Sequence, residues 1–75
     1  MKPLQARELS KLVKIGAIHN TAVKETPEGW TIQFNNGAYA SALDAGNARF
    51  FSTVASALNF LKGRGIFTAV VTMLN

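Results

Sequence analysis

The dipeptide Asn36-Gly37 constrains the fold of this chain more than any other feature of its sequence. Asn-Gly is the pair that most readily supplies the two positive φ angles of a type I′ turn, the commonest short turn between antiparallel strands. The segment Trp30–Phe34 precedes it and alternates apolar with polar residues, the pattern of a strand with one apolar face. A hairpin centred on this turn makes three cross-strand pairs: Phe34 with Tyr39, Ile32 with Ser41, and Trp30 with Leu43. The large side chains then gather on one face of the sheet.

Further strands are expected on both sides of this hairpin. The segment Ile18–Glu25 favours β structure and ends at the turn Thr26–Gly29, so we expect it to pair with the strand that follows the turn. On the other side, Gly46-Asn47 predicts a turn that leads into a short fourth strand, Ala48–Phe51, with Phe50 opposite Leu43.

Helical periodicity marks two segments. From Pro3 to Ile15, apolar residues recur at helical spacing with basic residues on the opposite face, and Gly16 is placed to end the helix. A second helix is expected after Ser52 or Thr53, either of which can cap it, and it ends at Gly63 and Gly65. The apolar faces of the two helices consist of Ala6, Leu9, Leu12 and Val13 in the first, and Val54, Ala57, Leu58 and Leu61 in the second.

The segment Ile66–Met73 is rich in β-branched residues and predicts a final strand, which a helical crossover would place parallel to an earlier strand. The expected fold class is α+β: a two-layer sandwich of helix, three- or four-strand antiparallel meander, helix and final strand, with both helices on the aromatic face of the sheet. With 75 residues, the whole chain from 1 to 75 makes a single domain.

The final strand is apolar on both faces. Val70 and Thr72 point one way, whereas Ala69, Val71 and Met73 point the other. A strand that is apolar on both faces is usually central in its sheet, with other elements packed on both of its faces. If it lies at an edge, it can pair with a strand of a second chain. Self-association is therefore worth testing whether the strand is central or at an edge.

Groups for catalysis are few. The chain has no cysteine and a single histidine, His19, which leaves neither a disulfide framework nor an imidazole or thiolate metal site. Asp44 and the three glutamates show no spacing typical of a catalytic triad. Gly63-Arg64-Gly65 follows a helix, whereas phosphate-binding glycine loops precede one. We therefore expect no enzyme activity, no cofactor and no metal.

Basic residues supply the candidate binding site. The net charge is +4, and most of the excess lies near the beginning of the chain, where Arg7, Lys11 and Lys14 form a row on one helix face that could contact successive phosphates. A second basic patch is expected from Arg49, Lys62 and Arg64. The same rows also suit ordinary solvent-exposed faces.

A helix-turn-helix is the alternative route to DNA binding. Glu8 to Pro27 can be laid on that motif with Gly16 in the turn, and Trp30 to Leu43 then forms a wing. Against it, β-branched residues such as Thr21 in the recognition helix favour a strand, and Pro27 would cut the helix short.

The region from Gly46 to Val71 resembles the small partition-associated proteins of bacterial plasmids and conjugative elements. Their pattern is an Arg-x-Phe strand, a Ser-capped helix that ends in Phe-Leu, and Gly-Ile before a final strand. The matching residues here are Arg49, Phe51, Phe60, Leu61, Gly65 and Ile66. The chain departs from the pattern at Ala45, where an arginine is common, and at Ala55, where an acidic residue is common. The resemblance implies a role in plasmid maintenance or the biology of mobile elements.

The predicted function is therefore a non-enzymatic accessory module of a plasmid or mobile element, which acts by contact with a protein partner or by self-association. The alternative is a small basic DNA-binding protein, either winged-helix-like or with a basic helix against phosphates. We expect a cytoplasmic protein without a membrane partner, because the apolar run Ile66–Leu74 is far shorter than the ~20 residues of a membrane span.

Overall fold

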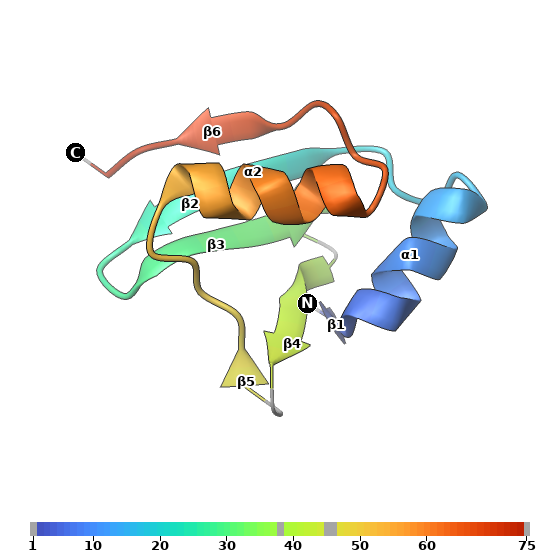
Figure 1. Cartoon of the computed structure of the whole chain (residues 1–75), viewed down its shortest axis with the longest axis horizontal. Helices are drawn as coiled ribbons and strands as arrows, with labels where there is room; N and C mark the ends of the chain where they lie inside the picture. Colours follow the sequence, from blue (N-terminus) through green and yellow to red (C-terminus); the bar gives the residue numbers. More distant parts are fainter. Residues whose placement is uncertain (1, 38, 45–46, 75) are drawn as a thin grey trace.

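The computed structural model describes residues 2–37, 39–44 and 47–74, and it has an α+β fold with two helices packed on a mixed sheet (Figure 1). The elements, in chain order, are β1 (Lys2–Leu4), α1 (Ala6–Lys14), β2 (Thr21–Thr26), β3 (Gly29–Phe34), the short 3₁₀ turn η1 (Asn35–Gly37), β4 (Tyr39–Asp44), β5 (Asn47–Ala48), α2 (Val54–Gly63) and β6 (Val70–Thr72). The α+β class expected from the sequence is confirmed.

The strands lie side by side in the order β1-β4-β3-β2-β6, with β5 paired to β4. The inner pairs β2 with β3 and β3 with β4 are antiparallel, whereas β1 runs parallel to β4 and β6 runs parallel to β2. The sheet is therefore mixed, and an antiparallel meander does not describe it as a whole. The last strand is parallel to an earlier one, as the helical crossover predicts.

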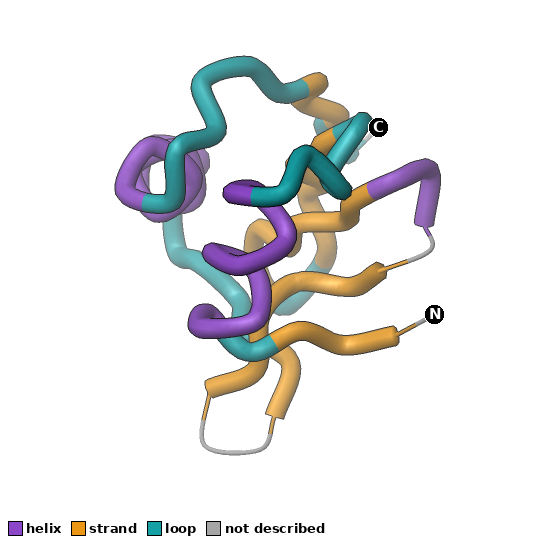
Figure 2. The backbone as a smooth tube through the Cα atoms, turned by 90° about the vertical axis from the view of Figure 1, so that its right-hand side faces the viewer, coloured by secondary structure: helices purple, strands orange, loops and turns teal. Residues whose placement is uncertain are grey.

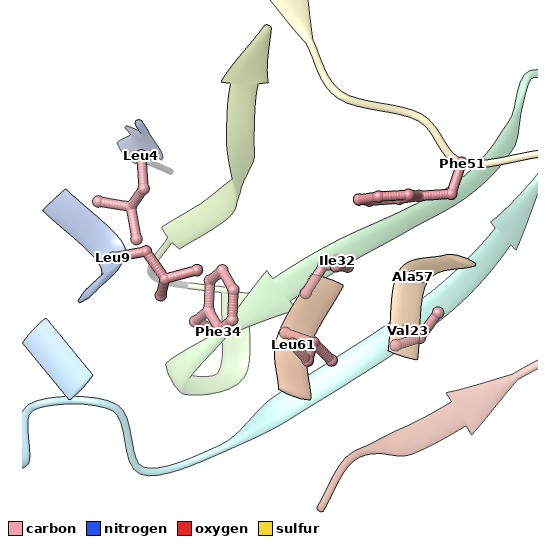
Figure 3. Packing of buried hydrophobic residues seen from close by; sticks show 8 residues of the cluster. All are labelled: Leu4, Leu9, Val23, Ile32, Phe34, Phe51, Ala57 and Leu61. Carbon is pink, nitrogen blue, oxygen red and sulfur yellow. The ribbon is translucent and has the colours of Figure 1, made fainter. Parts of the chain in front are cut away.

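Both helices cover the same face of the sheet, and the other face has no helix on it (Figure 2). The core between the two layers is a cluster of eight buried side chains (Figure 3): Leu4, Leu9, Val23, Ile32, Phe34, Phe51, Ala57 and Leu61. Val23 and Ile32 are paired across β2 and β3, so the centre of the sheet forms the side of this core opposite the helices.

The first helix is shorter than its periodicity suggests. It begins at Ala6 rather than Pro3, and residues Lys2–Leu4 instead form β1 at an edge of the sheet. Gln5 has an extended backbone and ends the strand just before the helix starts. Proline is tolerated in an edge strand because its missing N–H costs no hydrogen bond on the outer side. Gly16, with φ +75°, ends the helix as expected.

The predicted hairpin register holds next to the turn and fails further along. Phe34 pairs with Tyr39, as expected. Trp30, however, bonds to Phe51 through both its N–H and its C=O, each at 2.8 Å, so it does not pair with Leu43. Leu43 pairs with Ala48, so the expected Phe50–Leu43 pair is also wrong. Gly46, where the sequence predicts a turn, lies outside the described residues.

The turn itself explains part of this divergence. Asn35, Asn36 and Gly37 all have positive φ, of 53°, 57° and 91°, which is one residue more than a two-residue type I′ turn requires. A third residue in this conformation turns the chain further. On the side of β3 away from β2, Phe34 pairs with Tyr39 and Trp30 bonds to Phe51 in the segment before α2.

The second helix matches its prediction closely. The Thr53 hydroxyl accepts a hydrogen bond from the Ser56 N–H at 3.1 Å and so caps the helix. The helix ends at Gly63, and Gly65 has a φ of +88°. The ends of the two helices meet here, because a Cβ placed on Gly65 would lie 3.4 Å from Cγ1 of Val13.

Candidate functional site

The free edge of β6 is the first candidate for a binding surface. One side of this strand pairs with β2, and within the described residues no strand pairs with its other side. Around it, five large apolar side chains are exposed: Phe67, Val70, Val71, Met73 and Leu74. We call these five residues the apolar edge. Phe67 keeps 76% of its surface exposed and Met73 keeps 71%, so the core does not use them.

The apolar edge presents side chains on both faces of the sheet. Val71 lies level with the buried Val23 in a parallel register, so its side chain points to the helix-covered face. Val70 lies level with Ala22 and points to the open face. The strand is thus apolar on both faces, as its sequence suggests, and it occupies an edge rather than the centre of the sheet.

Natural edge strands are usually protected by charge or by proline, and β6 has neither. The sequence contains no charged residue and no proline from Ile66 to Asn75. At the opposite edge, β1 contains both Lys2 and Pro3. Beyond β6, the Leu74 N–H donates to Oε1 of Glu25 at 3.0 Å, which keeps the following residues alongside β2. The apolar edge is therefore held in place and open to a partner.

The basic residues of α1 are placed as the periodicity predicts. Arg7, Lys11 and Lys14 are all exposed, and their spacings of four and three residues put them on the same side of the helix, away from buried Leu9. Their only acidic neighbour on the helix is Glu8, in its first turn.

The structure brings together two residues of the second predicted basic patch, Arg49 and Arg64, and leaves Lys62 apart from them. The guanidinium carbon of Arg49 lies 5.0 Å from the ring centre of Phe51 and 5.1 Å from that of Phe60, and the guanidinium carbon of Arg64 lies 4.9 Å from the ring centre of Phe60. The two rings also pack together, with their centres 5.5 Å apart. We call Arg49, Phe51, Phe60 and Arg64 the arginine–phenylalanine cluster.

Lys62 does not join this cluster. It is exposed, and it lies two residues from Phe60 and from Arg64, which places it about 200° around the helix from either. Phe60 and Arg64, by contrast, are four residues apart and share one side of α2. That spacing is a sequence signal which could have separated Arg64 from Lys62 before the structure was known.

The open face of the sheet carries a shallow hollow of about 580 Å³. Its polar lining comes chiefly from His19, Lys24, Gln33, Asn36 and Thr68, and among its described lining residues there is no carboxylate. Within the part of the chain that the structure describes, no three residues of His, Cys, Asp or Glu lie close enough to hold a metal ion. His19 thus meets one lysine and several neutral polar groups.

The helix-turn-helix interpretation is wrong. Residues Thr21–Thr26, which would form its recognition helix, are strand β2 in the middle of the sheet. The β-branched residues of this segment favour a strand, and the pairing with β3 extends over the full length of β2.

Comparison with protein-family models, with curated proteins and with solved structures finds no match to this chain. Among the described residues, no helix combines the length and the apolar character needed to cross a membrane.

Proposed function

We propose that this chain is a non-enzymatic module that works in the cytoplasm by protein–protein contact, and that its first partner is a second copy of itself, bound through the apolar edge. The observation that carries the proposal is the position of β6: a strand that is apolar on both faces lies at an edge of the sheet. An exposed edge of this kind offers backbone hydrogen bonds and apolar contacts to the same partner.

The absence of charged residues in β6 allows a second copy as the occupant. Each chain carries a net charge of +4, so two copies repel each other over most of their surfaces. The segment from Ile66 onward contains no charged side chain of its own, and its charged neighbours include both a base, Lys24 level with Thr72, and an acid, Glu25 bonded to Leu74. In an antiparallel two-fold pairing centred on Val71, this residue lies opposite Val71 of the other copy, and Val70 lies opposite Thr72.

The area is sufficient for a modest dimer. At their exposed fractions, the five residues of the apolar edge present roughly 500 Å² per copy, so a two-fold contact buries at most about 1,000 Å² from them, which is the lower limit for a specific interface. We therefore expect self-association that depends on concentration rather than an obligate dimer.

Analytical ultracentrifugation tests this proposal. We expect the mass to rise with protein concentration from 8.1 kDa towards twice that value. Val71→Lys should keep the protein monomeric, because two lysines would then face each other across the two-fold axis. Ile15→Lys is the matched control: Ile15 is 76% exposed, lies outside the apolar edge and undergoes the same change of charge.

Two outcomes would overturn the proposal. One is a constant mass of 8.1 kDa at every concentration that the protein tolerates. The other is equal weakening of association by Val71→Lys and Ile15→Lys, since this would show that added charge alone opposes association. Circular dichroism of both variants verifies that they remain folded.

The resemblance to partition-associated proteins supplies the biological setting of the proposal: an accessory protein of a plasmid or conjugative element, with a role in its maintenance. Support comes from the six matching residues between Arg49 and Ile66. The genes beside this one test the setting. Partition or conjugation genes in that neighbourhood are the expected finding, and a neighbourhood of unrelated chromosomal genes would contradict it.

A further inference from the structure

The arginine–phenylalanine cluster holds two cations around one ring. Arg49 lies before α2 and Arg64 at its end, yet both guanidinium carbons are within 5.1 Å of the centre of Phe60. They are therefore at most about 10 Å apart. Two like charges at this distance repel each other, and the electrons of the aromatic faces offset part of that repulsion.

The phenylalanine rings lie about 5 Å from each guanidinium carbon and so cover one side of each group. A guanidinium can bind the oxygens of a phosphate in pairs through its N–H donors. Arg64 is half-buried, and its Nε is covered and has no hydrogen-bond partner among the described residues. Contact with Phe60, rather than a hydrogen bond from Nε, thus sets its position.

The cluster also adjoins the basic row of α1. Gly65 lies against Val13 where the two helices end, and Arg64 and Lys14 are each one residue away from that contact. Both helices lie on the same side of the sheet (Figure 2). Arg64 and Lys14 thus flank the contact between the helix ends, on the side of the sheet that the helices cover.

We propose that Arg49 and Arg64 form a binding site for the backbone phosphates of duplex DNA, with Lys14 extending it along α1. The axial rise of about 3.4 Å per nucleotide is only one component of the distance between phosphates, so guanidiniums within about 10 Å of each other suit the same phosphate or adjacent ones on one strand. Contact of this kind is independent of base sequence. The site does not include the apolar edge, so it does not depend on self-association.

Fluorescence anisotropy with a labelled duplex of about 20 base pairs tests the site. At about 50 mM salt, Arg64→Gln and Arg49→Gln should each weaken binding by about tenfold, and each should lower the slope of log affinity against log salt by about 1. Lys62→Gln is the matched control. It removes the same charge from the same helix, and we expect less than a twofold effect because Lys62 lies on another side of α2.

Arg64→Lys separates charge from geometry. Lysine keeps the charge but loses the flat guanidinium that stacks on Phe60 and binds phosphate in pairs, so we expect binding intermediate between that of the unaltered protein and that of Arg64→Gln. This variant also keeps the test informative if Arg64→Gln folds poorly. Thermal melting of each variant shows whether it is folded under the conditions of the binding assay.

Three results would overturn the proposal. No change in anisotropy at low salt would mean that the duplex does not bind. Equal losses from Lys62→Gln and Arg64→Gln would mean that only overall charge matters. A lower melting temperature with unchanged affinity would mean that Arg64 only stabilises the end of α2 and covers Phe60.

Discussion

Asn35 supplies hydrogen bonds to the loop before β2 that, among the described residues, no strand partner provides there. Its backbone N–H donates to the carbonyl of Asn20 at 2.8 Å, and its side-chain Oδ1 accepts from the N–H of His19 at 2.7 Å. Its Nδ2 donates to the carbonyl of Ala17 at 2.9 Å. The residue also adopts a positive φ of 53°, which asparagine tolerates better than most residues. Asn35 therefore ties the loop before β2 to the turn after β3.

Asn35→Ala should lower the free energy of unfolding by about 1–3 kcal/mol, because backbone groups of His19 and Ala17 lose their partner and alanine is strained at positive φ. Urea denaturation measures this change. Asn59→Ala is the control, since Asn59 is exposed on α2, and it should shift stability by less than about 0.5 kcal/mol. Similar values for the two variants would contradict the role given to Asn35.

The sequence predicts the conformation of Asn36-Gly37 in this turn but not the hydrogen bonds of the Asn35 side chain. Asn36-Gly37 is a local signal, because the conformation it favours depends on these two residues alone. The bonds from the Asn35 side chain reach residues 16 and 18 positions earlier, and no local pattern records them. The predicted strand from Ile18 begins at Thr21 instead, since Asn35 takes up the hydrogen bonds of the loop before it.

At the level of elements, α2 could be predicted well because its signals are local. A capping threonine, an apolar face and glycines at its end all lie within its own segment. Strand β1 could not be predicted, because three residues before a helix carry no periodicity of their own, and only the distant β4 gives them a partner. The strand after the Asn-Gly turn is present as β4, but its predicted pairing with β3 is wrong at Trp30, which bonds to the distant Phe51 and not to Leu43.

Leu61→Ala tests the packing of α2 on the sheet. Only 1% of the surface of Leu61 is exposed, and the residue belongs to the core cluster. Its truncation should therefore lower the free energy of unfolding by about 2–5 kcal/mol. In so small a domain, this loss can abolish folding at room temperature. Thermal melting checks the result against Ile15→Ala, which alters a largely exposed side chain and should be nearly neutral. An unchanged melting temperature for Leu61→Ala would mean that α2 does not pack as described.

Considered as a whole, the molecule has two candidate surfaces of different chemistry, one basic and one apolar. The basic residues of both candidate phosphate contacts lie on the helices or beside them, whereas the apolar edge is free of charge. The sequence predicts both sets of residues. It does not predict that Arg49 and Arg64 meet at Phe60 or that β6 lies at an edge, because both depend on how distant segments pack.

Salt should therefore act in opposite directions on the two proposed interactions. Raising salt from about 50 to 200 mM screens the repulsion between two chains of charge +4, so self-association should be unchanged or slightly stronger. Over the same range, affinity for duplex DNA should fall steeply as counterions compete for the phosphates. Sedimentation and anisotropy on one preparation measure both. Parallel weakening of the two would contradict an apolar contact between copies.

The two edges of the sheet differ in a way that sets the size of any assembly. A sheet that is receptive at both ends can go on recruiting copies and grow into a fibre. Here the β1 edge contains Pro3, which has no N–H to donate, whereas β6 contains no proline and no charged residue. If the β6 edges of two copies pair with each other, neither copy can offer that edge to a third, so this contact by itself gives a pair and not a fibre.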